Sequence, residues 1–384
     1  MIKRNKQILS VAQESPGYYD IKLLLPVFIL VIIGIIMVYS ASSVLALKKF
    51  GTDYFFLKKQ AMFAAAGVIA LVICRHFNYR YYKALAYPIL IFSIILLLAI
   101  HIPGIGYTAG GSARWLHLGG FTIQPSEFAR LAMIIYLAYS INKKQEDIKN
   151  FYVGFLPHVI VLAIFTLLLS LQPDFGSLII LCALTWTMLF VGGVRILYLA
   201  SSVLPLLPVA YIYMLKEPYR LRRWISFWDP WQYCSDEGYQ IVHSLMAFGT
   251  GGIWGTGIGN GYQKLYYLPE PHTDFILSVI GEELGLAGVV VIIILYAFIL
   301  IRGISIARKT EEPFGALLAT GITITIGMQA CINMGVTLGL LPTKGLTLPF
   351  LSYGGTSLLI NMAAVGILMN IGKSAHKNTN SRQV

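Results

Sequence analysis

Long apolar runs are the feature of this sequence that most constrains its fold. Runs of about 18 residues or more recur between Leu23 and Ile371, and each is long enough to cross the roughly 30 Å hydrocarbon core of a membrane as a helix. Of the 384 residues, 57% are hydrophobic and 12% are charged, whereas a soluble domain carries roughly 25% charged residues. We therefore predict an all-α polytopic membrane protein and exclude a soluble globular fold.

Helix-breaking residues divide these runs into about ten predicted transmembrane helices. An even number places both termini on one side, and the segments on that side hold more of the 29 Lys and Arg residues than the opposite segments. The positive-inside rule then predicts cytoplasmic termini. We expect an N-terminal tail at 1–20, a transmembrane domain at 21–371 and a C-terminal tail at 372–384. The predicted helices span 21–45, 60–75, 84–102, 124–142, 152–171, 175–193, 195–215, 275–301, 314–337 and 348–371.

A large extracytoplasmic loop, 216–274, is expected between the seventh and eighth helices. Loops of this length are usually functional. Its Tyr239–Phe248 part has apolar residues at helical spacing, which predicts an amphipathic helix at the membrane surface. The stretch Gly249–Gly261 holds seven glycines but neither nucleotide-binding glycine motif. We interpret these glycines as allowing tight turns and close backbone packing.

Charge and cysteine usage exclude several classes of function. The net charge of +12 comes mostly from short loops between spans, which favours contact with anionic lipid and argues against a nucleic-acid partner. The four cysteines fit neither a CxxC metal motif nor a disulfide framework. His117, His158 and His243 are isolated in the sequence, so no metal site is predicted from them.

Ionisable residues near a span are functional candidates, because charge in hydrocarbon is costly. Asp274 leads straight from the loop into an apolar run. It either caps the next helix or takes a proton from a hydroxyl of a lipid-borne substrate. Glu127 and Arg130 lie one helical turn apart and either form a structural pair or belong to a site. Asp174 has a similar choice between turn-former and site residue.

Three further candidates lie in loops expected on the outer side. Arg114, beside Trp115 in a Gly-rich loop, either grips a pyrophosphate or carboxylate or lies at the headgroups. Lys344 precedes a segment in which Pro349 and the SYGG run break the start of the last span. Broken helices near a membrane face often line a cavity, so Lys344 and Ser352 are candidate substrate-binding residues.

Six stretches, in order along nearly the whole chain, resemble one family of bacterial membrane proteins, the SEDS family of shape, elongation, division and sporulation proteins. Two of them look more like the division member of the family than its elongation member, and the sporulation member is also similar. The stretches are YSASS (39–43), GSARWL (111–116), QPSEFARLA (124–132), QPDFGS (172–177), the block 238–285 and LPTKGLTLPFLSYGGTS (341–357).

The resemblance implies a peptidoglycan glycosyltransferase that polymerises lipid II, the undecaprenyl-linked disaccharide pentapeptide, at the outer face of the cytoplasmic membrane. It implies ten helices with cytoplasmic termini, and it makes Asp274 the catalytic residue, as general base of an inverting reaction. The predicted substrate-binding residues are Arg114, Glu127, Asp174, Lys344 and Ser352. A further cluster could contact the pyrophosphate and consists of Arg220, Arg222 and Arg223. A divalent cation, Mg or Mn, could assist there, although no ligand set is visible.

The resemblance also implies a partner, a class B penicillin-binding protein, together with other division proteins at the septum. The main rival is a lipid II flippase, which would use the same charges as a translocation path. Such a path should place charges through the membrane depth, whereas these concentrate at the outer face, with Arg130 the exception. A scaffold that only recruits a partner would leave the outer carboxylates unexplained.

Overall fold

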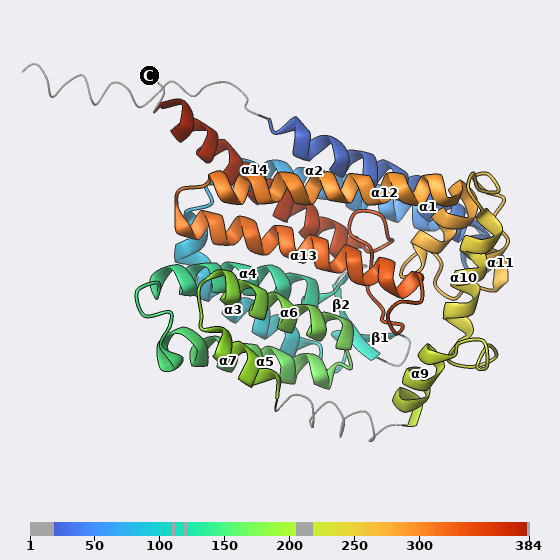
Figure 1. The fold of residues 1–384 in the computed structure, drawn as a ribbon. Helices are drawn as coiled ribbons and strands as arrows, with labels where there is room; N and C mark the ends of the chain where they lie inside the picture. Colours follow the sequence, from blue (N-terminus) through green and yellow to red (C-terminus); the bar gives the residue numbers. More distant parts are fainter. Residues whose placement is uncertain (1–18, 110–111, 119–120, 205–217, 382–384) are drawn as a thin grey trace, which may run out of the picture.

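The computed structural model describes residues 19–109, 112–118, 121–204 and 218–381. Long helices form a bundle, and short elements gather at one end of it (Figure 1). In chain order the elements are α1 (Ile21–Phe50), α2 (Phe55–His76), α3 (Tyr81–Ala99), β1 (Gly106–Ala109), β2 (Ser112–Leu118), β3 (Phe121–Ile123), α4 (Pro125–Lys143), η1 (Phe151–Phe155), α5 (Leu156–Leu171), α6 (Phe175–Val191), α7 (Ile196–Val203), α9 (Pro218–Trp228), α10 (Tyr239–Gly251), α11 (Gln263–Tyr266), α12 (Ile276–Lys309), α13 (Pro313–Thr337) and α14 (Gly355–Ser381).

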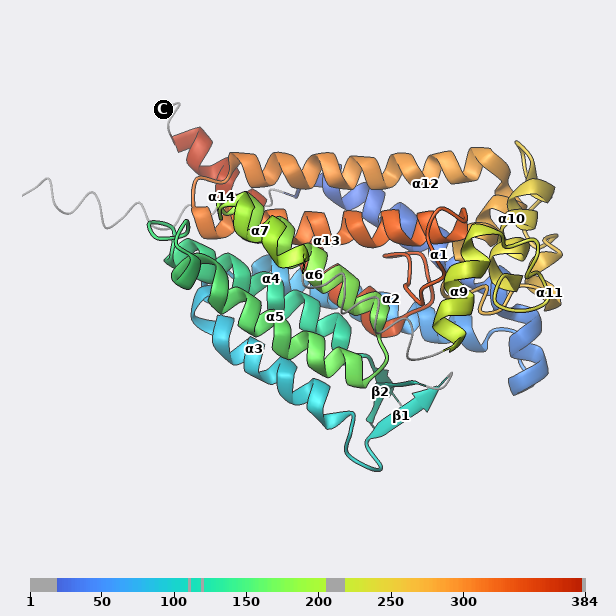
Figure 2. The same cartoon turned by 60° about the horizontal axis from the view of Figure 1, so that its bottom comes forward.

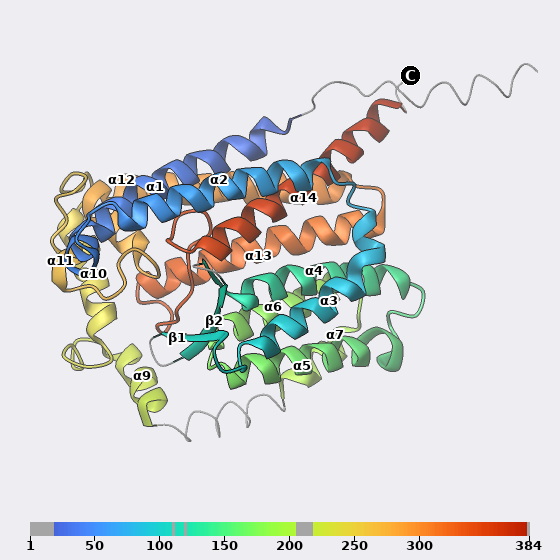
Figure 3. The same cartoon turned by 180° about the vertical axis from the view of Figure 1, so that it is seen from behind.

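The helices follow the predicted spans in order, so the protein is a multi-pass helical membrane protein. Seven helices among the described residues are long and apolar enough to cross a membrane, and α6 is a shorter apolar helix. The 19-residue α4 also lies within the bundle (Figures 1 and 3). The predicted seventh helix, 195–215, is described only as far as residue 204. The number ten therefore stays a prediction.

Three predicted boundaries in the C-terminal part of the chain differ from the structure. The last helix begins at Gly355 rather than 348, because 349–354 takes an irregular path. It continues to Ser381, so most of the predicted tail at 372–384 is helical. The helix predicted at 275–301 extends to Lys309. Polar residues past the apolar run continue both helices, which hydrophobic length alone does not reveal.

The start of α1 and the end of α14 lie at the same end of the bundle, here called the terminal end (Figure 1). An ion pair ties the chain there, since Arg302 Nε donates to the two Asp20 oxygens at 2.9 and 2.8 Å. At this end Arg80 and Lys83 also pair with Glu312. The opposite end, here called the loop end, carries α9, α10, α11 and the strands (Figure 2).

A small sheet at the loop end was not predicted. The strands β1, β2 and β3 pair antiparallel in that order, with Tyr107 opposite Trp115 and His117 opposite Thr122. The strands have four, seven and three residues, too short for an alternating pattern to stand out between two helices. The sheet fixes the segment that was expected to be a Gly-rich loop, and it holds Arg114 on β2.

The irregular segment between α13 and α14 is held by side chains of neighbouring helices. Asn333 Nδ2 donates to the Leu346 carbonyl at 2.6 Å, and Gln329 Nε2 donates to the Thr347 carbonyl at 3.1 Å. Because non-helical backbone at membrane depth must find internal partners, these amides make the broken path possible. The prediction that this break lines a cavity is confirmed below.

The glycine-rich stretch packs its backbone against a break in α12. Gly285 has φ 67° and interrupts the helix, and the amides of Leu286 and Ala287 donate to the carbonyls of Gly252 and Ile253 at 2.9 and 3.1 Å. A side chain at Gly255, whose φ is +81°, would collide with the Glu283 carbonyl. Only glycine permits this approach, so the predicted role of these glycines is confirmed.

Two buried acidic residues before the break fasten the same region. Glu283 pairs with Lys264 of α11 and accepts hydrogen bonds from Ser40 of α1 at 2.7 and 2.8 Å. Glu282 accepts the amide of Tyr262 at 2.8 Å. The first part of α12, Ile276–Leu284, is thereby held at the end remote from Asp274.

Candidate active site

A cavity of about 460 Å³ opens at the loop end, and Asp274 lies on it. Its walls come from segments far apart in the sequence: α2, β2, β3, the end of the long loop, the irregular segment and the start of α14. The lining residues are Phe63, Arg114, Trp115, Thr122, Gln124, Glu270, Thr273, Asp274, Gly345, Thr347, Tyr353, Gly354, Gly355, Thr356 and Ser357.

Asp274 does not cap the helix that follows it. The residue at the N-cap position of α12 is Phe275, and no side chain caps this helix. Asn333 Nδ2 donates to the Asp274 carbonyl at 2.8 Å and fixes the backbone here. The half-buried side chain of Asp274 borders the cavity instead. The alternative of a simple helix cap is therefore wrong.

The Asp274 carboxyl group is poised to exchange a proton near neutral pH. Removal from water raises its pKa to about 7, and the negative charges of Glu270 and Asp174 act in the same direction. The positive charge of Arg114 lowers the pKa but does not offset these effects. A carboxylate with a raised pKa binds a proton more strongly than a carboxylate in water. A general base works best when its pKa is close to the working pH, so this pKa suits a base near pH 7.

Arg114 faces the same part of the cavity from β2. A Cβ at Gly345 would lie 3.4 Å from Asp274 Oδ2 and 3.6 Å from Arg114 Nη1. The guanidinium is held by Nη2, which donates to the Pro173 carbonyl at 2.6 Å, while its buried Nε has no hydrogen-bond partner among the described residues. A cation and a carboxylate thus flank one small surface, on which a reacting anionic group can bind.

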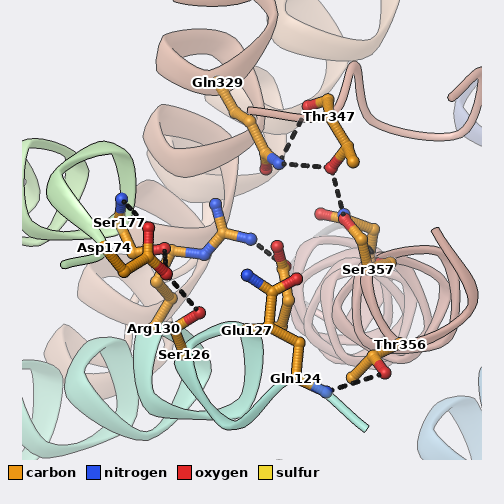
Figure 4. Close-up of polar contacts among 11 residues, drawn as sticks. Gln124, Ser126, Glu127, Arg130, Asp174, Ser177, Gln329, Thr347, Thr356 and Ser357 are labelled. Carbon is orange, nitrogen blue, oxygen red and sulfur yellow. Dashed lines mark hydrogen bonds and ion pairs between the residues drawn. The ribbon is translucent and has the colours of Figure 1, made fainter. Parts of the chain in front are cut away.

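Uncharged polar side chains form the floor of the cavity, and Figure 4 shows them together. The backbone N–H of Gln124 donates to Thr356 Oγ1 at 3.1 Å, and Thr347 Oγ1 donates to Ser357 Oγ at 3.1 Å. Gln329 supports Thr347 from α13. Sequence reasoning missed these residues, because an uncharged polar residue near a span gives no signal that separates it from a helix cap.

Glu127 does not line the cavity, and its side chain lies near those of Gln124 and Arg130 (Figure 4). It is 5% exposed and forms an ion pair with Arg130 one turn along α4. Both residues border a separate space of about 20 Å³, which holds about one water molecule. The structure therefore places Glu127 in a structural pair.

Asp174 also lies outside the cavity, where it caps α6. Its carboxylate accepts hydrogen bonds from the Ser177 amide at 3.3 Å, the Ser177 hydroxyl at 2.8 Å and the Ser126 hydroxyl at 3.1 Å. A buried aspartate with these partners is a typical N-cap. Asp174 follows Pro173, whose carbonyl accepts from Arg114. Asp174 therefore positions the turn that holds Arg114, and its negative charge helps to raise the pKa of Asp274.

Two candidates on the irregular segment are near the cavity without lining it. Lys344 precedes Gly345, which lines the cavity. The Lys344 ammonium lies 5.8 Å from the centre of the Phe175 ring. Ser352 is 3% exposed, and its hydroxyl accepts the Leu348 amide at 2.8 Å. Ser352 therefore stabilises a turn, and the expectation that it contacts substrate is not supported by its position.

The basic cluster of α9 borders a different cavity. Arg222 Nε lies 3.2 Å from Glu237 Oε1, and Arg222 and Arg223 line a space of about 730 Å³ that does not include Asp274. The side chain of Arg220 lies outside the described residues. Arg222 and Arg223 are thus not among the residues that line the Asp274 cavity, because they line the space that α9 forms with the turn after it and the start of α10.

Two residues beside Asp274 contribute differently. Glu270 lines the cavity and raises the Asp274 pKa. His272 is buried between Phe56 and Tyr353, with ring centres 4.6 and 5.5 Å away, and burial lowers its pKa to about 4. His272 is therefore neutral near pH 7 and acts as a packing residue.

These features define a polytopic membrane protein whose polar cavity at one membrane face joins a proton acceptor to a cation. Residues 21–377 match the FtsW, RodA and SpoVE family, described as "Cell cycle protein". The chain therefore belongs to this family, which is the SEDS family that its motifs resemble.

Relatives and solved structures agree over nearly the full length. The chain is 47% identical to "Probable peptidoglycan glycosyltransferase FtsW" of Geobacter metallireducens, covering 92% of this chain and 94% of that protein. It is 41% identical to "Stage V sporulation protein E" of Bacillus subtilis, covering 95% and 99%. A chain in the structure "Structural coordination of polymerization and crosslinking by a peptidoglycan synthase complex" has a TM-score of 0.76 and 25% identity, covering 94% and 99%.

Proposed function

We infer that this chain is a peptidoglycan glycosyltransferase that polymerises lipid II at the outer membrane face, with Asp274 as general base. The observation that carries this proposal is the shared approach of Asp274 and Arg114 to Gly345 in the loop-end cavity. The family and the printed names of its relatives support the reaction class. The terminal end then faces the cytoplasm, and the loop end faces the peptidoglycan.

In the proposed reaction, the 4-hydroxyl of the acceptor GlcNAc attacks the anomeric carbon of the donor MurNAc. Its proton passes to the Asp274 carboxylate as the new C–O bond forms. The bond to the lipid-linked pyrophosphate breaks with its electron pair, and undecaprenyl pyrophosphate leaves. Attack from the face opposite the leaving group inverts the anomeric carbon, so an α-linked donor gives a β-1,4 product. General-base assistance contributes about 10²–10⁴-fold.

Arg114 is the group that we assign to the departing pyrophosphate. Its guanidinium is fixed by the Pro173 carbonyl and presents Nη1 toward Gly345. A pre-positioned cation stabilises charge that develops in the transition state without reorganisation. Lys344, one residue from Gly345, adds positive charge at the edge of the same surface.

A divalent cation would find few protein ligands here. The described residues contain no group of three or more His, Cys, Asp or Glu side chains that could hold a metal, and Glu270 and Asp274 are the carboxylates on the cavity. Protein ligands alone therefore do not make a site for Mg or Mn. Such an ion would take most of its ligands from the pyrophosphate and water, and activity measured after chelation tests whether it is needed.

The position of the charges supports polymerisation over lipid flipping. The Asp274 cavity lies at the loop end. A separate space of about 20 Å³, bordered by the Glu127–Arg130 pair, Thr325, Asn361 and six apolar side chains, has room for about one water molecule and none for a sugar. A translocation path for a disaccharide would need a polar route through the bundle. Among the described residues, the larger of these two spaces is the Asp274 cavity, and it lies at the loop end.

We also propose a role in cell division at the septum, with a class B penicillin-binding protein as partner. The FtsW name of the relatives supports division, and the similar complex joins polymerisation to crosslinking. Septal recruitment of a fluorescent fusion in dividing cells, compared with its distribution in elongating and sporulating cells, tests the division role. Co-purification with each class B penicillin-binding protein of the same cell tests the partner.

Strand synthesis from lipid II tests the reaction and the role of Asp274 together. Purified wild type, Asp274→Asn and the matched control Asp147→Asn, at an exposed site, are each incubated with lipid II and the partner. We expect strands from wild type and the control, and at least a 100-fold loss for Asp274→Asn in a folded protein. Equal activity of all three would exclude Asp274 as the base. Movement of lipid II across vesicles without strand synthesis would establish the flippase.

A further inference from the structure

A second cavity lies at the loop end, between α9, the turn after it and the start of α10, and is here called the α9–α10 cavity. Its volume is about 730 Å³, within the range of about 300–1,000 Å³ common for ligand pockets. Both helices lie at the loop end of the bundle (Figures 1 and 2). The cavity therefore faces the extracytoplasmic side.

The charges on this cavity cancel. Arg222 pairs with Glu237 at 3.2 Å, and the lining holds two arginines and two acidic side chains. A pyrophosphate site needs an excess of positive charge and charge-assisted donors. This balance removes the basis for assigning Arg222 and Arg223 to pyrophosphate, and a ligand without net charge along its backbone fits better.

The polar groups on the cavity suit the hydroxyl and acetamido groups of sugars. Gln240 and Ser235 each offer both donors and acceptors, and sugar hydroxyls need the same mixture. Tyr239 adds an aromatic ring, which packs on His243 with ring centres 4.2 Å apart. A polymer of sugars could form hydrogen bonds along its length with the carboxylates, arginines and side-chain amide of this open surface, and it could pack against the aromatic ring.

The α9–α10 cavity directly adjoins the Asp274 cavity along the chain. Pro269 lines the first, and the next residue, Glu270, lines the second. Adjacent Cα atoms are about 3.8 Å apart, so both cavities border the same short segment of backbone at the loop end. A sugar polymer is long enough to occupy both.

We propose that the α9–α10 cavity binds the growing glycan strand, at sugars beyond the MurNAc that reacts at Asp274. This inference rests on the proposed polymerase function and adds a strand-holding subsite to it. Between additions, the strand stays bound by these sugars while a new lipid II enters the Asp274 cavity. The subsite thereby determines how many disaccharides are added before the strand is released, and it leaves the chemical step unchanged.

Strand length is the property that tests the subsite. The full-length protein is incubated with labelled lipid II, and strand lengths and initial rates of lipid II use are measured for wild type, Gln240→Ala and Ser235→Trp, which fills the cavity. Gln232→Ala, an exposed glutamine that does not line the cavity, is the matched control. We expect strands at least threefold shorter for both cavity variants, initial rates within about twofold of wild type, and unchanged strands for the control.

Several results would overturn the proposal. Wild-type strand lengths in both cavity variants exclude a strand subsite, and so does equal shortening by Gln232→Ala. A higher KM for lipid II with unchanged strand length assigns the cavity to the incoming substrate. Loss of partner binding at unchanged strand length assigns it to a protein contact. Strand synthesis by wild type in the same assay tests the polymerase function separately, because no cavity variant enters that measurement.

Discussion

Asp274 Oδ2 and Arg114 Nη1 would lie 3.4 and 3.6 Å from a Cβ placed on Gly345. The proton acceptor and the cation thus meet at one glycine, although they come from the end of the long loop and from β2. This relationship combines a base for the attacking hydroxyl with a charge for the leaving group.

The pH dependence of strand synthesis should follow the Asp274 carboxyl group. Its pKa is raised to about 7, and the group acts as a base only when deprotonated. We expect kcat/KM to rise about tenfold per pH unit below pH 7 and to level off above it. Initial rates from pH 5 to 9 measure this profile. A rate already constant between pH 5 and 6 contradicts it.

Stability should respond to pH in the opposite direction. Because the folded-state pKa of Asp274 lies above its ordinary value of 3.8, ionisation of this group costs stability. The cost is absent below that value and grows as the pH rises to about 7. Asp274→Asn should therefore unfold at a higher temperature than wild type at pH 8, with a smaller difference at pH 5. A difference that does not change with pH would show that Asp274 is not destabilised by its charge.

Arg114 should contribute to the rate through charge and geometry. Removing a pre-positioned transition-state donor typically costs about 10²–10³-fold in kcat, and we expect this loss for Arg114→Ala. Arg114→Lys should recover part of it, since lysine keeps the charge but loses the planar fork. Arg80→Ala, in an exposed ion pair at the terminal end, is the control. Full activity of Arg114→Ala would remove this residue from the mechanism.

Gly345 should tolerate a methyl group in the fold but not in the reaction. The added Cβ would make ordinary van der Waals contacts with Asp274 and Arg114, so Gly345→Ala should unfold at nearly the wild-type temperature. It would occupy the surface where the pyrophosphate and the hydroxyl meet, and small displacements there cost about 10²-fold. Gly249→Ala, with open space around it, is the control. Wild-type kcat for Gly345→Ala would show that substrate binds elsewhere.

The buried Lys264–Glu283 pair should matter for stability. Both side chains are almost inaccessible to solvent, and removing one partner leaves an uncompensated buried charge, at a cost of about 3–5 kcal/mol. Lys264→Met and Glu283→Gln should each lower the unfolding midpoint clearly, and the double variant should lose less than the sum of the two. Additive losses in this double-mutant cycle would mean that the two residues act independently.

The sequence alone pointed to the two charged residues that the candidate site brings together, because some signals are local. Asp274 and Arg114 were both selected as rare charges beside spans, and the cavity joins them. The broken start of the last helix was visible in Pro349 and the SYGG run. By contrast, Asp174 and Glu127 had two open alternatives, since a carboxylate near a helix start looks the same whether it binds a substrate or a neighbouring amide. In the structure Asp174 accepts from Ser177 and Glu127 pairs with Arg130, and these contacts favour the structural alternative for both residues.

Apolar run length, loop charge and motif order determined that this chain is a multi-pass membrane protein of its family, because each is a property of continuous sequence. The tertiary structure decided which distant segments meet. It brought β2 to the irregular segment before α14, lined the cavity with uncharged polar residues, and placed Arg222 and Arg223 on a separate, charge-balanced cavity. These relationships depend on helix packing and on a sheet of three short strands, and neither leaves a periodic pattern in the residues that it positions.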